Sequence, residues 1–247
     1  MNFNKLAGVY TTICCLLTNL AAGNVELVDF GLPSGNLWAV CNIGAEKPWD
    51  AGNYFAWGET ITKSDYSWET YKYCNGKWNG ITKYGKGDDY CAEGFSDNLR
   101  NLESVDDVAT VTYGDLYMIP TVDDWHELFN NSYMQWTDNY NDTGTKGCII
   151  YRAKKDEDKG VFGKTLSSYS LADTHIFLPV GGYMDGTALK CDDTHCVYWT
   201  STVSNICSNN GRDYIFFAKS AGYSGELRCE GLLVRAIKKV RITNKDE

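Results

Sequence analysis

The sequence predicts an α+β domain with short antiparallel strands, two or so helices and long irregular loops. Two observations favour this class. Short apolar and aromatic runs, punctuated by glycine and asparagine, recur along the 247 residues, and such runs are typical of strands joined by turns. Only two segments carry clear helix signals, and they do not alternate with the strands, so we do not expect a doubly wound parallel sheet.

The strand candidates are short segments rich in β-branched and aromatic residues, each bounded by turn residues. They lie at residues 25–30, 37–41, 54–57, 148–152, 176–178, 198–201, 214–218 and 232–242.

Both helices are predicted from their first turns. Thr121 can cap a helix, and Asp124 three residues later completes a capping box. Trp125 begins the apolar face of this helix, which ends near residue 131. Ser104 and Asp107 begin a shorter helix by the same logic. We therefore interpret the acidic pairs 106–107 and 123–124 as helix-start charges rather than as catalytic or calcium-binding groups.

The composition restricts the function. Hydrophobic residues make up 43% of the chain and charged residues 22%, enough apolar material for a core, while the net charge is −9. That charge disfavours nucleic acids and anionic membranes as partners. Eight Trp and seventeen Tyr suit a loop-rich binding domain. The four tryptophans Trp38, Trp57, Trp125 and Trp199 are expected to anchor the core in separate elements.

Three parts are expected along the chain. Residues 1–24 form a leader, 25–240 a single domain and 241–247 a polar tail. The leader has one positive charge and then a mostly apolar run, which fits either a cleaved signal peptide or a retained helix that trimerises or docks a fibre. No other segment reaches the roughly 20 apolar residues of a membrane span.

Ten cysteines favour an oxidising compartment or a particle released from the cell. Eight lie outside the leader, and we expect some to be paired and some to be free. The cluster around Cys191, His195 and Cys196 could ligate zinc, but no second metal-binding knuckle follows. His126 lacks a histidine four residues later, so a zinc-protease pair is absent. We expect neither a metal nor a cofactor.

Several runs in sequence order resemble the Fibrobacter succinogenes major paralogous domain family. They include VDFGLPSGNLWAVCNIGA at 28–45, YFAWGET at 54–60 and IFLPVGGY at 176–183. Together the matching runs span residues 25 to 240. The resemblance implies a C-type-lectin-like fold, shared with formylglycine-generating enzymes, in a protein of gut Bacteroides-type bacteria or their phages. Tyr117 replaces the usual arginine of the family, and LVRAI at 233–237 replaces its closing motif.

The segment 185–230 is rich in Gly, Asn, Ser, Asp and Tyr, the residues of adaptable binding loops. We expect a non-catalytic module, an adhesin or phage receptor-binding protein, that contacts a cell-surface protein or glycan outside the cell, at the cell surface or on a virion. The resemblance adds that a diversity-generating retroelement can vary such loops. The predicted face consists of Asp192, Asp193, His195, Asn205, Cys207, Asn209, Asn210, Asp213, Tyr214, Tyr223 and Arg228.

An enzyme is the alternative. A copper oxidase related to the formylglycine-generating group would need a cysteine pair, and Cys191 with Cys196 has a suitable separation. The surrounding sequence lacks the motif that accompanies the enzyme pair. Calcium-dependent sugar binding is not expected either, because neither Glu-Pro-Asn nor Trp-Asn-Asp occurs.

Overall fold

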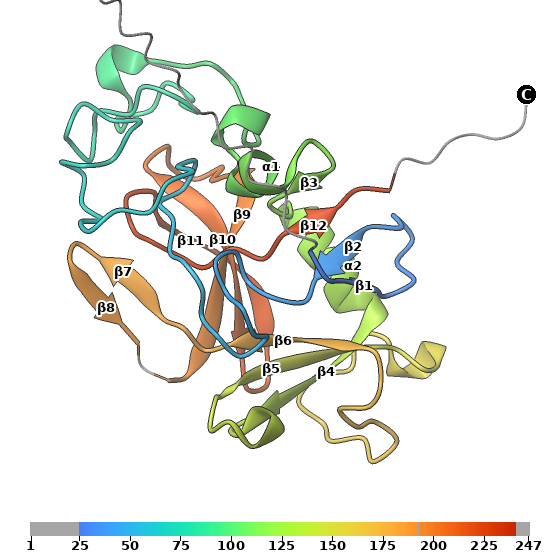
Figure 1. The fold of residues 1–247 in the computed structure, drawn as a ribbon. Helices are drawn as coiled ribbons and strands as arrows, with labels where there is room; N and C mark the ends of the chain where they lie inside the picture. The colour runs from blue at the N-terminus through green and yellow to red at the C-terminus, as the bar shows by residue number, and fades with distance from the viewer. Residues whose placement is uncertain (1–24, 192, 241–247) are drawn as a thin grey trace, which may run out of the picture.

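The computed structural model describes residues 25–191 and 193–240. In these residues twelve strands form four antiparallel groups, and two α-helices accompany them. The predicted leader, Asp192 and the predicted tail lie outside these described residues. The arrangement confirms the α+β class, with mostly antiparallel strands and few helices (Figure 1).

One sheet joins the two ends of the described chain. Its order is β1 (Leu27–Asp29), β2 (Leu37–Ala39), β12 (Ile237–Lys238) and β3 (Tyr117–Met118), with every neighbour antiparallel. In Figure 1 the red β12 accordingly lies beside the blue β2. Trp38 of β2 pairs with Ile237, so this sheet fixes the last strand directly over the core.

A second sheet and a hairpin occupy the middle of the sequence. The sheet consists of β4 (Ser132–Thr137), β5 (Gly147–Arg152) and β6 (His175–Pro179), with β5 in the centre. Five of the six residues of β5 are buried, because both faces of this central strand are covered. The hairpin is formed by β7 (Tyr183–Asp185) and β8 (Ala188–Lys190), and every residue of β8 is exposed.

The third sheet contains the longest strands and carries the region of functional interest. Strand β10 (Asn210–Phe217) lies between β9 (His195–Val203) and the edge strand β11 (Ala221–Leu227). Both pairings are antiparallel.

Each α-helix begins directly after a residue whose side chain caps its first turn. Helix α2 (Val122–Asn131) has the predicted capping box, because Thr121 Oγ1 accepts from the Asp124 backbone and Asp124 accepts from the Thr121 backbone. Helix α1 (Val108–Tyr113) begins after Asp107, whose carboxylate accepts two backbone N–H groups. Single-turn 3-10 helices occur at Ala92–Gly94, Ser104–Asp106, Tyr140–Asp142 and Asp156–Asp158.

The core forms around the four predicted tryptophans, each at most 1% exposed. The rings of Trp38 and Trp125 lie 4.6 Å apart between centroids and share one cluster with residues of β5, β6 and β10. Trp57 and Trp199 belong to a second cluster. Truncation of a buried tryptophan removes about 3–5 kcal/mol of stability, so these rings set the rigidity of the scaffold.

The boundaries of several predicted strands and of one predicted helix differ from those in the structure. Residues 54–57 form no strand, only a bridge between Phe55 and Leu232. The helix expected from Ser104 starts after Asp107 instead. Of the segment 232–242, only the two residues of β12 are a named strand. Strands β3, β4, β7, β8 and β11 were not predicted. The sequence of β11 is AGYSGEL, which has a low strand propensity, and its pairing with β10 holds it in place.

Candidate functional site

The candidate site is built on the two faces of the β9–β10–β11 sheet. Successive side chains of a strand point to opposite faces. Tyr214 pairs with Tyr223 across β10 and β11, whereas Asp213 pairs with Trp199 and Gly211 with Glu226. One face therefore carries the buried Tyr214 and the solvent-exposed Tyr223, and the other carries the carboxyl groups of Asp213 and Glu226.

The first face presents what we call the Tyr223 surface, formed by His126, Asn205, Arg212 and Tyr223. The Tyr223 side chain is 49% exposed. The Arg212 guanidinium carbon lies 4.6 Å from the centroid of the Tyr223 ring, and Arg212 Nη2 also donates to Asn205 Oδ1. The His126 ring approaches Tyr223 at 5.3 Å between centroids. An exposed aromatic ring is thus held between two nitrogen-bearing groups.

An apolar residue extends this surface. Ile206 follows Asn205 in the loop between β9 and β10 and is 78% exposed. Tyr and Arg are the residues most enriched where binding energy concentrates in protein interfaces. The surface is held by strands β10 and β11 and by helix α2, which limits its conformational freedom before binding.

Only two of the residues predicted for the binding face, Asn205 and Tyr223, lie on the Tyr223 surface. His195 lies elsewhere on the sheet, against the Phe217 ring at 5.5 Å, and lines a cavity of about 460 Å³ with Tyr183, Leu189, Lys190 and Cys191. Asp193 is exposed and lies 3.8 Å from Lys146.

The remaining predicted residues have local roles or lie outside the described structure. The side-chain amide of Asn210 donates a hydrogen bond to the Gly225 carbonyl. Cys207 is half-buried in the loop before β10. Asp192 is not among the described residues.

Four predicted contact residues are buried and do not belong to an exposed face. Tyr214 stacks on Trp125 in the core. Arg228 is fully buried and donates to the carbonyls of Lys83 and Tyr84. Asn209 is 7% exposed and Asp213 is 0% exposed. The composition of this segment predicted exposed loop residues. These four residues instead lie within strand β10 or directly beside β10 and β11, with their side chains buried.

The second face adjoins a carboxyl cluster, formed by the buried Asp213 and Glu230 and the half-buried Glu226. Neither carboxylate oxygen of Asp213 has a hydrogen-bond partner, and neither does Glu230 Oε2. Burial, then the charge of Glu226, raises the pKa of Asp213 to about 7. Burial, then the charges of Glu226 and Asp185, raises the pKa of Glu230 to about 8. Burial also raises the pKa of Glu226.

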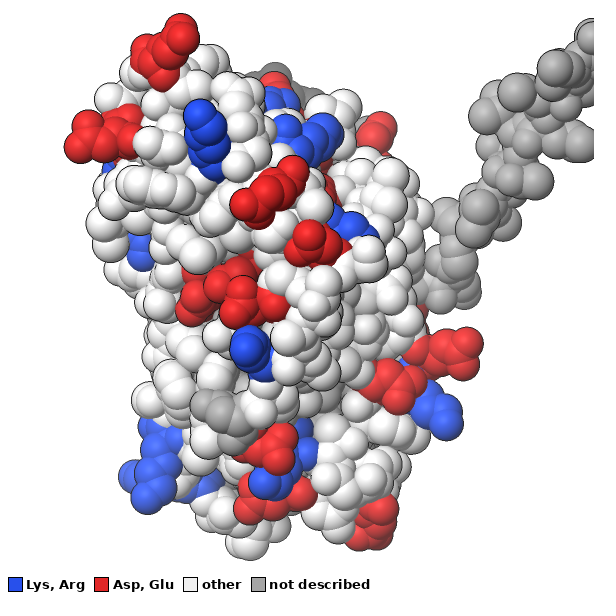
Figure 2. Space-filling view, turned by 90° about the vertical axis from the view of Figure 1, so that its left-hand side faces the viewer, with Lys and Arg blue, Asp and Glu red and all other residues white. Residues whose placement is uncertain are grey.

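Acidic groups are prominent on this side of the molecule. Figure 2 shows Asp and Glu side chains gathered in the middle of the face that carries β7 and β8. Nevertheless, no three His, Cys, Asp or Glu side chains in the described ranges are placed to hold a metal ion together.

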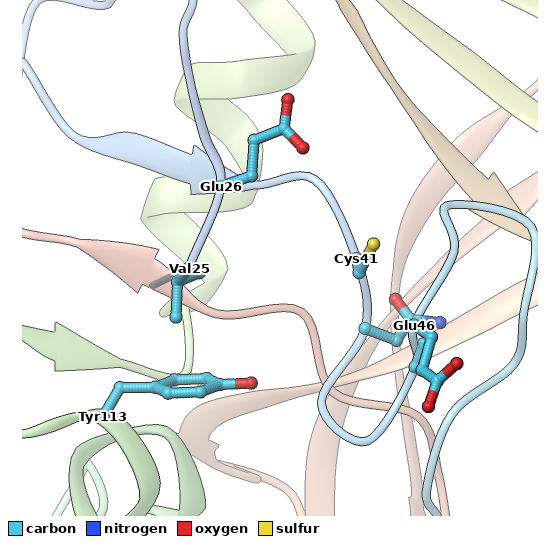
Figure 3. Close-up of a pocket in the computed structure, with 7 residues that line it drawn as sticks. Val25, Glu26, Cys41, Glu46 and Tyr113 are labelled. Carbon is cyan, nitrogen blue, oxygen red and sulfur yellow. The ribbon is translucent and has the colours of Figure 1, made fainter. Parts of the chain in front are cut away.

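A separate cavity of about 320 Å³ opens beside the first strand, lined among others by Glu26, Cys41, Glu46 and Tyr113 (Figure 3). Burial is the main reason that the pKa of the Cys41 thiol is raised, although Arg235 opposes the shift. The thiol form therefore predominates at neutral pH, which makes Cys41 a weak nucleophile. This cavity is formed by elements other than those of the Tyr223 surface.

The cysteines differ from expectation. Seven are free thiols in the described chain, so the predicted pairing is not found among them: Cys41, Cys74, Cys91, Cys148, Cys196, Cys207 and Cys229. Cys196 is fully buried, and its thiol donates to the Leu178 carbonyl. Cys191 is exposed. The two thiols of the copper-oxidase alternative thus lie in opposite environments, which does not favour a shared copper ion.

Sequence reasoning missed Arg212 and His126. Extending the strand alternation back from Tyr214 places Arg212 on the same face of β10 as Tyr214, and that signal was present in the sequence. His126 lies on helix α2, far away along the chain, and no local pattern links it to Tyr223.

Comparisons with known proteins returned no relatives: no family model, no curated protein and no solved structure matches this chain. The resemblance to the major paralogous domain family therefore stays a prediction from the sequence. No helix of the described residues has the length and apolarity needed to cross a bilayer.

Proposed function

We propose that this chain is a non-catalytic binding module with a C-type-lectin-like fold, which contacts a cell-surface protein or glycan through the Tyr223 surface. One observation carries the proposal: an exposed tyrosine ring is fixed between Arg212 and His126 on regular secondary structure. Because these side chains are already ordered, little conformational entropy is lost when a partner binds.

The chemistry of the surface suits a partner with both apolar and polar groups. The Tyr223 ring offers a flat apolar face, and Arg212 offers donors whose geometry fits carboxylate, carbonyl or hydroxyl oxygens. Asn205 adds a donor and an acceptor. Ile206 extends the apolar area. The proposed setting is an adhesin or a phage receptor-binding protein outside the cell, carried as a homotrimer or on a larger fibre or virion.

Diversification by a retroelement belongs to the same proposal. None of Asn205, Ile206, Arg212 and Tyr223 is Lys, Glu, Gln, Met or Trp, the residues that variation of adenines in Asn codons does not produce. An adenine-variable template repeat near the encoding DNA is the expected observation, and its absence would remove this part of the proposal.

The binding test uses the full chain on intact bacterial cells and on arrays of glycans and surface proteins at pH 6. Tyr223→Ala and Arg212→Ala should each weaken binding at least tenfold, because each removes half of the stacked pair. Trp78→Ala is the matched control, since Trp78 is a similarly exposed aromatic residue, 54% exposed, in another part of the fold. Equal binding by all three variants and the wild type would refute a role for the Tyr223 surface.

A further inference from the structure

Asp213 and Glu230, the two buried members of the carboxyl cluster, lack hydrogen-bond partners that buried carboxyl groups normally have. Asp213 is 0% exposed with both oxygens unpartnered, and Glu230 is 9% exposed with one oxygen unpartnered. A buried carboxylate without a cation or hydrogen-bond donors is unfavourable in its ionised form. The negative charge of Glu226 adds to the effect of burial and raises the pKa of Glu230 further. The arrangement is thus compatible with protons and poorly compatible with several negative charges.

Aromatic rings, rather than cations or hydrogen-bond donors, surround the Asp213 side of strand β10. Trp199 lies opposite Asp213 in the sheet. The Trp57 ring fills the space beside Gly211, where an added Cβ would lie 2.5 Å from it. These rings exclude water from the side of β10 on which Asp213 lies.

The charged and titratable neighbours come from each adjoining element. Asp185 of β7 acts on Glu230, and His195 of β9 acts on Glu226. Arg212 of β10 weakly favours the ionised form of Asp213, but its guanidinium stacks on Tyr223. Cys229 adjoins Glu230. No ion pair to any of the three cluster carboxyls is found in the described structure.

The carboxyl cluster and the Tyr223 surface lie on opposite faces of the same two strands, β10 and β11. Asp213 lies between Arg212 and Tyr214 in β10, and Glu226 lies three residues after Tyr223 in β11. Strand β11 is an edge strand, hydrogen-bonded within the sheet to β10 alone. Separation of β11 from β10 is therefore the smallest movement that would bring water to the carboxyl groups.

We propose that the carboxyl cluster is a proton-dependent switch: protonated Asp213 and Glu230 keep the β10–β11 hairpin closed, and loss of these protons opens the hairpin and disorders the Tyr223 surface. The second half of this statement rests on the proposed function, whereas the opening of the hairpin does not. The raised pKa values, about 7 for Asp213 and about 8 for Glu230, place the transition between neutral and mildly alkaline pH.

The direction in which pH shifts the equilibrium between the closed and the open hairpin follows from proton linkage. An ordinary Asp or Glu in an unfolded chain loses its proton near pH 4, while these groups retain theirs to higher pH in the closed form. The closed form therefore binds more protons than the open form between about pH 4 and pH 8. Raising the pH through this window favours the open form.

Hydrogen exchange of the intact chain tests the switch without any ligand. Amide protection in β10 and β11 is compared at pH 6 and pH 8.5, after correction for the intrinsic exchange rate, with the central strand β5 of the other three-stranded sheet as the internal reference. We expect protection of the hairpin to fall at least tenfold more than that of β5. Equal changes in the two regions would overturn the proposal.

Two variants keep the test independent of folding failure. Asp213→Asn with Glu230→Gln removes the ionisable groups and should reduce the pH effect to less than threefold; Glu230→Gln alone should give an intermediate value. An unchanged pH effect in either variant would overturn the assignment to this cluster. Addition of 5 mM CaCl2 at pH 8.5 should not restore protection, and restoration would identify a cation site instead of a proton switch.

The outcome is separable from that of the proposed function. If the hairpin opens with pH but the Tyr223 variants bind normally at pH 6, only the proposed function fails. If binding depends on Tyr223 at pH 6 and protection does not change with pH, only the switch fails.

Discussion

Asp106 and Asp213 are both buried aspartates, 2% and 0% exposed, yet the protein surrounds them in opposite ways. Asp106 accepts hydrogen bonds from the hydroxyl groups of Tyr73 and Tyr84 and from the ammonium group of Lys83. Burial alone would raise the pKa of Asp106, but these donors lower it below its usual value. Asp213 has no donors, and burial raises its pKa to about 7.

The difference shows that the partners of a buried carboxyl group decide its role. Lys83 Nζ lies 2.6 Å from Asp106 Oδ2, and the Tyr73, Tyr84 and Trp57 rings pack edge to face around this site. The Asp106 network therefore joins the loop that precedes α1 to the core as an ion pair with hydrogen bonds. The carboxyl cluster instead leaves one strand pair sensitive to protons.

The largest expected effect comes from Asp106→Ala. The substitution leaves Lys83, Tyr73 and Tyr84 without their shared acceptor, and the free energy of unfolding should fall by about 3 kcal/mol at pH 7. Urea denaturation measures the change. Asp156→Ala is the control, because Asp156 is exposed and pairs with Lys159 alone in the described structure, and exposed pairs contribute less than about 1 kcal/mol. Equal effects of the two substitutions would contradict the special role of the Asp106 network.

A smaller effect is expected from the carboxyl cluster, which should make the stability of the wild type fall as the pH rises. Between pH 5 and pH 8.5 the wild type should lose about 2 kcal/mol of stability, because the folded state binds more protons than the unfolded state in this range. Asp107, with a pKa raised by burial to about 6, contributes in the same direction. In Asp213→Asn the loss should shrink by roughly a third, because Glu230 and Asp107 still retain their protons longer in the folded state. Urea denaturation across this pH range checks both statements, and a wild-type stability that rises with pH would contradict them.

The smallest effect on stability is expected from Tyr223→Ala. Tyr223 is half exposed, and its ring contacts in the described structure are with His126 and Arg212, so the midpoint of thermal unfolding should shift by no more than the equivalent of about 0.5 kcal/mol. Calorimetry at pH 6 measures this midpoint. A large shift would mean that Tyr223 holds the hairpin together, and loss of binding by this variant would then lose its simple interpretation.

The sequence predicted those parts of the fold that depend on interactions between residues close together in the chain. The capping box of Thr121 and Asp124 lies within four residues, so helix α2 was placed correctly. Large apolar rings have few positions available outside a core, so the burial of the four tryptophans was also predictable. The strand centres of β5, β6 and β9 followed from their apolar runs, whereas the Gly-rich β11 carries no such run.

The candidate site was less predictable because its contacts are long-range. Whether Asp213 is buried depends on Trp57 and Trp199, which precede it by many residues. The contact of His126 with Tyr223 depends on how α2 packs over the sheet. Composition drew attention to the segment 185–230 as a whole, but composition does not distinguish the two faces of a strand.

The close approach of Gly211 to Trp57 limits how this region can evolve. Any side chain at position 211 would collide with an indole ring that is itself 1% exposed and donates its N–H to the Thr200 carbonyl. A library of sequence variants can therefore be broad at Asn205, Ile206 and Tyr223, while glycine should be retained at 211 in every folded member.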